Sequence, residues 1–403
     1  MIIRSRFLQT GHQRCIENAY IEIDDNLIVG FGEAASAPRR ADEDFGDAVI
    51  LPGFINAHTH LELTHLHKLV QPSPDFTDWL WRLVTHFRAN PLDEKRVADS
   101  VREGIRQTLA AGVVAIGDIS RGPSLSRPQL VASPLYGVSF GEVIAIGKGR
   151  SLLAPKVTAA ANRSAEPDRI VAGISPHAPY TIEPDGIRLC VAVAAEQGSR
   201  MCMHLLETAE ETDFTTKRTG VFVDYLQRLG VWDDDVPQAG HTPFGLAVSC
   251  GLLGPRCVLA HMNYVTDDEM TALAGAGASV AYCPQTHAAF EHPPHRFRDM
   301  LAAGINVCIG TDSLATNPTL SVMDELRFLH QRYPDVEVDL LLQLGTTNGA
   351  RALGLDDRFG FLDTGRPAHL AVFPVDAESG SWEACFQSNY GARATYIDGA
   401  RVH

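Results

Sequence analysis

The sequence has no long apolar run and no segment typical of a signal peptide. None of its 403 residues lies in a stretch close to the roughly 18 apolar residues that a membrane-spanning helix needs. The N-terminal segment MIIRSRFLQTGHQRC lacks the apolar core and the small-residue cleavage site of a secretory leader. We therefore expect no membrane partner and a cytoplasmic location.

Paired cysteines are also missing. The chain has eight cysteines, but none forms a C-x-x-C pair, so a zinc cluster with cysteine ligands is not expected. Several cysteines lie in apolar runs such as MCMHL and NVCIGTD. Such surroundings are typical of buried free thiols in a reducing compartment.

Basic residues are in the minority. The chain has 49 acidic and 34 basic residues and a net charge of −15, which opposes binding to nucleic-acid phosphates or to anionic lipids. The H-x-E and P-C-x-x-C signature of the zinc deaminases that act on nucleic-acid bases is absent as well. A hydrophobic fraction of 45% is typical of a globular protein that builds its core without disulfides. We expect a small molecule as the partner, and no nucleic acid.

The two ends of the chain are rich in strand patterns. AYIEIDDNLIVGFG near the N-terminus and GRPAHLAVFPVD near the C-terminus both alternate apolar and polar residues, as half-buried strands do. Two such ends around a long middle section predict one small β-sandwich domain built from residues 1–50 and 363–403, with a separate domain over residues 51–362.

The middle section alternates short apolar runs with helical patterns. The helical patterns DEKRVADSVREGIRQTLAAG and PDGIRLCVAVAAEQG each end at a glycine, as helices often do. This alternation implies parallel strands with crossover helices, and eight units predict an α/β fold of the (β/α)8 TIM-barrel type. The expected strands are Val49–Asn56, Val113–Asp118, Leu135–Ile146, Ile170–Ser175, Arg200–His204, Arg256–His261, Ala278–Cys283 and Ile305–Thr311.

Histidines and carboxylates stand where four of these strands end. The carboxyl ends of the strands form the active-site face of a TIM barrel, so these side chains would share one mouth. A lone H-x-H is a weak signal in a sequence with 16 histidines, but the joint pattern favours a site for Zn²⁺ or Fe²⁺. The residues in strand order are His58 and His60, His204 followed by Glu207, His261, and Asp312.

With these residues in place, the chain resembles the amidohydrolase superfamily, in the branch of amino-heterocycle deaminases and triazine hydrolases. Within that branch it looks most similar to aminodeoxyfutalosine deaminases, chiefly through HTHLELT and CPQTHAAF. The matching segments span most of the chain in the order of the family: LPGFINAHTHLELT, SPHAPYT, HLLETAEE, LAHMNYV, CPQTHAAFEHPP, GTDSLATNPTLSVMDELRFL and TTNGARALGL.

The resemblance implies a role for each of these residues. His261 would orient a water and help to deprotonate it, Glu207 would move a proton to a ring nitrogen of the substrate, and His177 would contact the substrate. The expected fourth strand, RIVAGISPH, has no lysine of the kind that bridges two metals in binuclear members, which implies one divalent metal, zinc or alternatively iron. The metal ligands implied by the resemblance are His58, His60, His204 and Asp312.

Four further residues are weaker candidates for the substrate site. Glu62 either faces the substrate or serves as a loop carboxylate, and Glu142 ends a predicted strand. Trp79 and Trp81 could stack on a flat heterocycle, but their spacing allows only one of them to face the site, and packing of the helix is the alternative.

Other polar residues near these segments are assigned structural roles or none. Asp118 is expected to orient a loop, and His369 to lie in the terminal sheet away from the chemistry. Gln285 stands where relatives often carry arginine, which leaves the substrate open. His65 and His67 are expected in the loop after the first strand, and no role is assigned to the cluster of His287, His292 and His295.

Taken together, the sequence predicts an aminohydrolase that releases ammonia from a purine- or nucleoside-like amino-heterocycle, of the aminodeoxyfutalosine or adenosine type. The alternatives are a hydrolase of the same fold that removes an amide nitrogen or a halide, and a non-catalytic relative. The intact set of histidines and acids disfavours the non-catalytic relative. A homodimer is the usual default for a soluble enzyme.

Overall fold

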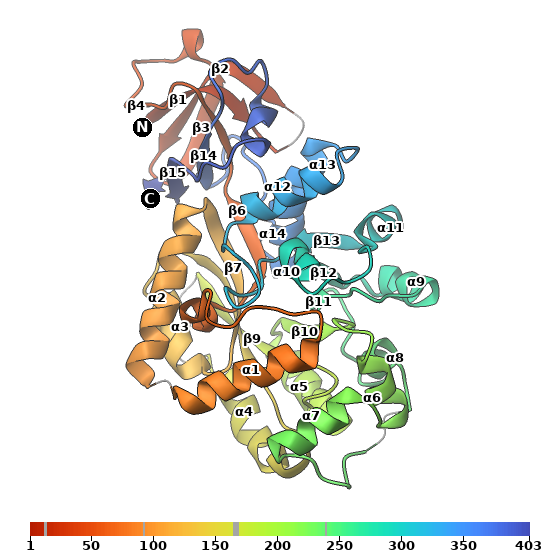
Figure 1. Ribbon diagram of the computed structural model, residues 1–403. Helices are drawn as coiled ribbons and strands as arrows, with labels where there is room; N and C mark the ends of the chain where they lie inside the picture. Colours follow the sequence, from red (N-terminus) through yellow and green to blue (C-terminus); the bar gives the residue numbers. More distant parts are fainter. Residues whose placement is uncertain (12–13, 92, 164–168, 238–239) are drawn as a thin grey trace.

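The computed structural model describes residues 1–11, 14–91, 93–163, 169–237 and 240–403. In Figure 1, strands from both ends of the chain lie together at the top, where the two termini also lie, and the middle of the chain forms a barrel below them. The sequence-based expectation of a TIM-type barrel with a small β domain from both termini is therefore confirmed.

The barrel consists of eight parallel strands that follow one another in chain order. A bridge between Thr59 and Asp312 joins the first strand to the segment after the last. There the His60 N–H donates to the Asp312 carbonyl oxygen at 3.1 Å. The strands are β6 (Phe54–Thr59), β7 (Val113–Ser120), β8 (Tyr136–Val143), β9 (Ile170–Pro176), β10 (Met201–Leu205), β11 (Cys257–His261), β12 (Ser279–Tyr282) and β13 (Asn306–Ile309).

Helices follow the barrel strands and cover the outside of the barrel (Figure 1). They are α1 (Phe76–Ala89), α2 (Glu94–Ala110), α3 (Pro123–Val131), α4 (Leu153–Ala160), α5 (Pro184–Gln197), α6 (Glu211–Lys217), α7 (Val221–Leu229), α8 (Pro243–Ser249), α9 (Asp267–Ala276), α10 (Pro284–Ala289), α11 (Phe297–Ala302), α12 (Val322–Arg332), α13 (Val338–Gly345) and α14 (Thr347–Leu353). The described residues also form short 3-10 helices, namely η1 (Ala34–Ser36), η2 (Leu61–Leu66), η3 (Gly147–Leu152) and η4 (Trp382–Phe386).

Local signals set the ends of the two helices that the sequence indicates most clearly. Asp93 caps α2 by accepting a hydrogen bond from the Arg96 N–H at 2.8 Å. Helix α5 ends at Gly198 with φ of 67°, a left-handed conformation that glycine adopts without steric cost. Both helices occupy the segments expected from their sequence patterns.

The first expected barrel strand, Val49–Asn56, is wrong in its bounds because the segment contains two strands. Its first part lies in β5, Ala48–Pro52, which pairs antiparallel with a C-terminal strand, and only its second part lies in β6. Gly53 separates the two, and a Cβ atom at this position would lie 2.4 Å from a methyl carbon of Val114. Both strands are completely buried, so no polar residue marks the division.

The terminal domain is a single mixed sheet with its own core. Strand β5 lies between the N-terminal β1 and the C-terminal β14 and so joins the two ends of the chain. The core includes Ile3, Ile21, Ile50 and Tyr396. The strands are β1 (Ile2–Gln9), β2 (Cys15–Asp24), β3 (Leu27–Glu33), β4 (Glu43–Asp44), β5, β14 (Leu370–Pro374), β15 (Ala394–Ile397) and β16 (Ala400–Arg401).

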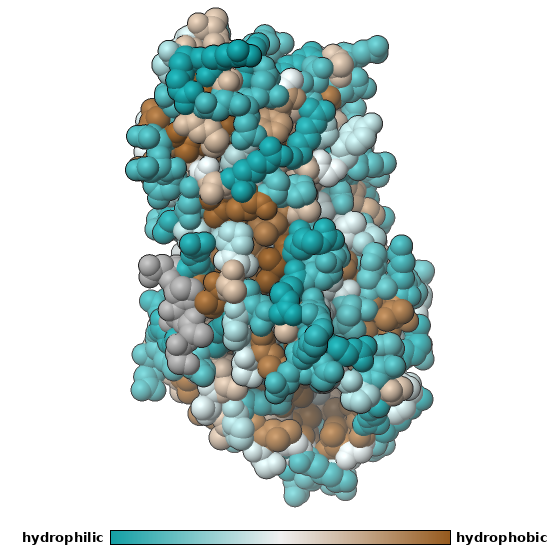
Figure 2. Space-filling model, turned by 90° about the vertical axis from the view of Figure 1, so that its left-hand side faces the viewer, coloured by the Kyte–Doolittle hydropathy of each residue, from teal (hydrophilic) through white to brown (hydrophobic). Residues whose placement is uncertain are grey.

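The molecular surface is mostly hydrophilic on the face shown in Figure 2. A hollow lined with hydrophobic residues lies low on this face, where Figure 1 places α1, α4 and α7. Within the described ranges, no helix is both long and apolar enough to cross a membrane.

Candidate active site

Three histidines from two strand ends meet at the mouth of the barrel. His58 lies near the end of β6, His60 directly follows this strand, and His204 lies on β10. One ring nitrogen from each can be chosen so that all three lie within 4.8 Å of one another. The Nε2 atoms of His60 and His204 are 3.2 Å apart. This is the only such cluster of possible metal ligands among the residues that the structure describes.

The protonation of these histidines suits metal binding. Burial, together with the neighbouring histidines, holds the pKa of His58 and His60 well below its usual value and lowers that of His204 to about 3. His204 Nδ1 donates to the His177 carbonyl oxygen at 3.1 Å, which leaves the Nε2 lone pair facing the cluster. His58 Nε2 is buried without a hydrogen-bond partner. Neutral imidazoles with free lone pairs fit a divalent metal such as zinc.

Asp312 stands beside this cluster, just after β13. Its Oδ1 lies 3.4 Å from His60 Nε2 and 3.8 Å from His58 Nε2. Its Oδ2 accepts a hydrogen bond from the Thr316 hydroxyl at 2.9 Å. Burial raises the pKa of Asp312 to about 7, and a bound cation would act in the opposite direction. One oxygen of Asp312 therefore faces the histidines while the other is held by the loop after β13.

Glu207 and His261 form a buried pair beside the histidine cluster. His261 Nε2 lies 3.5 Å from Glu207 Oε1. Burial, with the negative charges of Asp312 and Glu211 nearby, raises the pKa of Glu207 well above its usual value. This environment favours the protonated form of the carboxyl group, which is the form that can donate a proton.

Glu211, a residue that the sequence does not single out, holds the turn that carries Glu207. Its carboxylate accepts hydrogen bonds from three consecutive backbone N–H groups: Leu206 at 3.0 Å, Glu207 at 2.7 Å and Thr208 at 3.1 Å. Burial raises its pKa to about 8, while these three donors act in the opposite direction. The only sequence signal is an acid four residues after Glu207.

Three candidates for substrate contact line one cavity with these residues. The cavity has a volume of about 280 Å³ and includes His177, Glu142 and Trp79 in its walls. His177 Nε2 lies 3.5 Å from Glu142 Oε1, and the other oxygen of Glu142 is buried without a hydrogen-bond partner. Burial raises the pKa of Glu142 and lowers that of His177 to about 3.

Glu62 is turned away from the cavity and toward the loop after β7. Its carboxylate accepts hydrogen bonds from the Ser120 hydroxyl at 2.6 Å, from the N–H groups of Arg121 and Gly122, both at 3.0 Å, and from the Ser126 hydroxyl. These contacts favour the loop-carboxylate alternative for Glu62.

Asp118 also serves a loop. It is completely buried and accepts a hydrogen bond from the Leu61 N–H at 2.9 Å. This contact orients the 3-10 helix η2 that follows the metal-site strand. Of the two tryptophans, Trp79 is buried in the cavity wall, whereas Trp81 packs against the guanidinium of Arg228 at 3.6 Å.

Three further histidines and Gln285 make structural contacts. His65 lies in η2 with its Nδ1 2.9 Å from the Glu62 carbonyl oxygen. His295 Nε2 donates to the His261 carbonyl oxygen at 2.8 Å, so the histidine cluster after β12 supports the backbone of the catalytic candidate His261. Gln285 donates to buried Glu325 at 3.2 Å. His369, next to β14 of the terminal domain, stacks on Phe359 of the barrel core.

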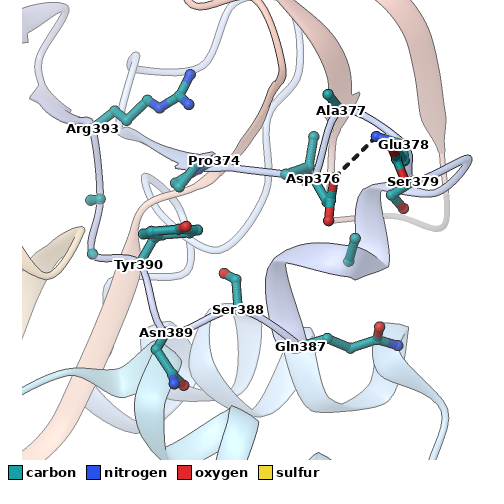
Figure 3. Close-up of a pocket in the computed structure, with 14 residues that line it drawn as sticks. Pro374, Asp376, Ala377, Glu378, Ser379, Gln387, Ser388, Asn389, Tyr390 and Arg393 are labelled. Carbon is teal, nitrogen blue, oxygen red and sulfur yellow. Dashed lines mark hydrogen bonds between the residues drawn. The ribbon is translucent and has the colours of Figure 1, made fainter.

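A second and wider depression lies on the terminal domain (Figure 3). Its charged residues Asp376, Glu378 and Arg393 are exposed, and Asp376 accepts a hydrogen bond from the Glu378 N–H at 3.0 Å. Tyr390 is also exposed here. The depression contains none of the metal-ligand candidates, and we assign it no catalytic role.

The barrel fold and the cluster of His58, His60 and His204 define a metal-site barrel of the hydrolase type. Comparison with known proteins gives the family. A family model described as the amidohydrolase family matches residues 49–390. The chain is 30% identical over 347 residues to the 5'-deoxyadenosine deaminase of Methanoregula boonei, covering 82% of this chain and 72% of the relative. The chain belongs to the amidohydrolase family.

Two further comparisons are with deaminases, one by sequence and one by fold. It is 29% identical over 329 residues to the aminodeoxyfutalosine deaminase of Deinococcus radiodurans, covering 79% of this chain and 76% of the relative. The structure superposes on Helicobacter pylori aminofutalosine deaminase in complex with methylthio-coformycin with a TM-score of 0.86, at 21% identity and full coverage of both chains. The family resemblance inferred from the sequence is confirmed, and the chain is a hydrolase of the deaminase type.

Proposed function

We propose that the protein deaminates a purine- or nucleoside-like amino-heterocycle, of the adenosine or aminodeoxyfutalosine type, and releases ammonia. The observation that carries this proposal is the Glu207–His261 pair beside three neutral histidines. A buried carboxyl group whose pKa is raised by its surroundings is suited to donate a proton to a ring nitrogen. The deaminase names of the relatives in Methanoregula and Deinococcus support the same reaction.

The proposed cofactor is one divalent metal, zinc or alternatively iron, held by His58, His60, His204 and Asp312. Such an ion supplies Lewis acidity and lowers the pKa of a water from about 15.7 toward 7. Strand β9, Ile170–Pro176, carries no lysine that could bridge a second metal, which favours one ion.

Three side chains would move the protons of the reaction. Glu207 protonates the ring nitrogen next to the carbon that carries the amino group, so that negative charge does not develop on the ring. With the help of His261, Asp312 accepts the first proton of the attacking water and passes it to the amine, whose bond to the ring carbon then breaks. The second water proton returns to Glu207 as the ring carbonyl forms. Thr316 holds the second oxygen of Asp312 and so fixes the direction of the first.

The other cavity residues would hold the heterocycle. His177 and Glu142 offer hydrogen-bonding atoms to polar substrate groups, and Trp79 offers an aromatic face. Glu62 would act indirectly, because it fixes the loop that carries Arg121, a further residue of the cavity wall.

An ammonia-release assay over adenosine, 5'-deoxyadenosine, aminodeoxyfutalosine, guanine and a pterin tests this proposal. We expect one equivalent of ammonia per product molecule with at least one of these substrates. Hydrolysis of an amide or a halogenated triazine, with no ammonia from the panel, would instead establish the alternative leaving group.

The variant Asp312→Asn tests the assigned proton route. We expect it to lower kcat by about 10²- to 10⁴-fold, the usual contribution of a positioned acid–base group. Asp268→Asn is the matched control, since Asp268 is exposed on α9 and remote from the site. Full activity of Asp312→Asn would refute the role of Asp312.

A further inference from the structure

An apolar cluster distinct from the barrel core covers the mouth of the barrel. Its residues come from α1, α7 and the segments that follow several barrel strands, and they include Phe76, Tyr180, Phe222 and Phe290. Tyr180 and Phe222 stack with ring centroids 3.9 Å apart. Figure 1 shows α1 and α7 side by side across the lower part of the molecule.

The cavity of the candidate active site continues from the histidines into this cluster. The wall there is formed by hydrophobic side chains, in contrast to the polar end that holds His60 and His204. We call this part of the cavity the apolar arm and define it by Leu80, Leu83 and Phe87 of α1, Leu226 and Leu229 of α7, and Ile146 after β8.

Charged groups are scarce in the apolar arm. Arg121 is the only lysine or arginine among the described residues that line the whole cavity. Its Nε lies 3.8 Å from Glu142 Oε2, and its guanidinium lies 5.5 Å from the ring of Phe87. A negative substrate group in the arm would thus lose its water and compete with Glu142 for one partly exposed cation.

One buried polar atom in this wall lacks a partner. Trp79 is 7% exposed, and its indole Nε1 is buried without a hydrogen-bond acceptor. The other α1 side chains that line the cavity, Phe76, Leu80, Leu83, Val84 and Phe87, carry no polar atom. A buried donor without an acceptor fits a ligand that brings a neutral acceptor, such as an ether, thioether or hydroxyl group.

We infer that the apolar arm binds an uncharged alkyl or aryl substituent of the substrate and discriminates against substituents that end in a carboxylate or ammonium group. The inference rests on the proposed function, because it assumes that the amino-heterocycle occupies the metal end of the same cavity. Burial of apolar surface favours the uncharged substituent, whereas desolvation of a charge disfavours the other.

A series of adenosine derivatives that differ only at the 5' position tests this inference. The series is 5'-deoxyadenosine, 5'-methylthioadenosine, 5'-butylthioadenosine and S-adenosylhomocysteine. We expect kcat/KM to rise roughly three- to fourfold for each methylene that becomes buried. We expect kcat/KM for S-adenosylhomocysteine to be at least tenfold lower than that for the butylthio compound, which has a chain of similar length. Equal values across the series, or a preference for the homocysteine compound, would overturn the inference.

Binding of the same series, measured by calorimetry, separates the inference from the proposed function. If no compound releases ammonia but Kd improves with chain length, the proposed deamination is refuted while the apolar arm stands. If ammonia is released at rates and affinities independent of the substituent, the deamination stands and the arm is refuted.

Two variants on different helices locate the effect. Leu83→Asn and Leu229→Asn replace half-buried leucines that line the arm. Each variant should reduce the ratio of kcat/KM for the butylthio compound to kcat/KM for 5'-deoxyadenosine. Leu189→Asn is the control, since Leu189 is 37% exposed on α5 and lies outside the cavity. An unchanged chain-length dependence in both arm variants would contradict the assignment.

Discussion

Replacing Glu211 by glutamine changes one oxygen of the carboxylate that holds the turn beneath Glu207. Oε1 accepts from the N–H groups of Glu207 and Thr208, and Oε2 accepts from that of Leu206. Leu206 has φ of 51°, a left-handed conformation that an L-residue adopts only at a cost in free energy. The carboxylate therefore stabilises a strained turn immediately before the proposed proton donor.

The size of the effect follows from this geometry. The amide of glutamine keeps one acceptor oxygen but turns an NH₂ group toward the Leu206 N–H, so the Leu206 N–H and the new NH₂ group are two buried donors without an acceptor. At about 1–3 kcal/mol for each of these two unsatisfied buried groups, the free energy of unfolding should fall by roughly 2–6 kcal/mol. A displaced Glu207 should lower kcat by about 10- to 100-fold, because misplacement by 1 Å is known to cost about 10²-fold.

Glu210→Gln is the matched control, because Glu210 is the neighbouring residue and is exposed. The assay is steady-state ammonia release with denaturant unfolding of the same preparations. A positioning role predicts that kcat falls while KM changes little. If Glu211→Gln matches Glu210→Gln in both kcat and unfolding free energy, the reasoning about this turn is refuted.

Two further predictions concern the proton donor and the histidine cluster. Glu207→Gln should lower kcat by about 10²- to 10⁴-fold with metal content unchanged, and an active variant in a turnover assay would exclude Glu207 as the acid. Burial lowers the pKa of His287 and His292 to about 4 and that of His295 to about 3, from the usual value of 6.5. At a pH between 6.5 and these lowered values, the unfolded chain therefore binds more protons than the folded chain. The free energy of unfolding should therefore fall as pH decreases through this window, by up to about 1.4 kcal/mol per pH unit for each histidine. Denaturant titrations at pH 7, 6 and 5 measure this slope, and His292→Gln should reduce it; an identical slope would contradict the assignment.

The barrel and its strand-end residues could be predicted because their signals are local. Short apolar runs followed by helical patterns mark the strands, and the two-residue spacing of His58 and His60 places both on one face. The strand ends that carry His204 and Asp312 are identified in the same way, and the barrel then brings distant residues together without any knowledge of their distances.

The remaining features depend on contacts that the sequence does not show. The division between β5 and β6 falls in a continuous apolar run, where only Gly53 marks the change of sheet. The partners of Glu62 lie about sixty residues further along the chain, so its orientation toward the β7 loop follows from the fold alone. Helical periodicity allowed Trp79 or Trp81 to face the site, and only the position of α1 over the mouth decides for Trp79.

Reconstitution of the metal-free protein with zinc tests the central claim most directly. After removal of metal by a chelator, ammonia release from a nucleoside substrate should be lost, and it should return in proportion to added zinc up to one equivalent per chain. Activity that persists without metal, or that rises until two equivalents are bound, would contradict a deaminase built on one ion at His58, His60, His204 and Asp312.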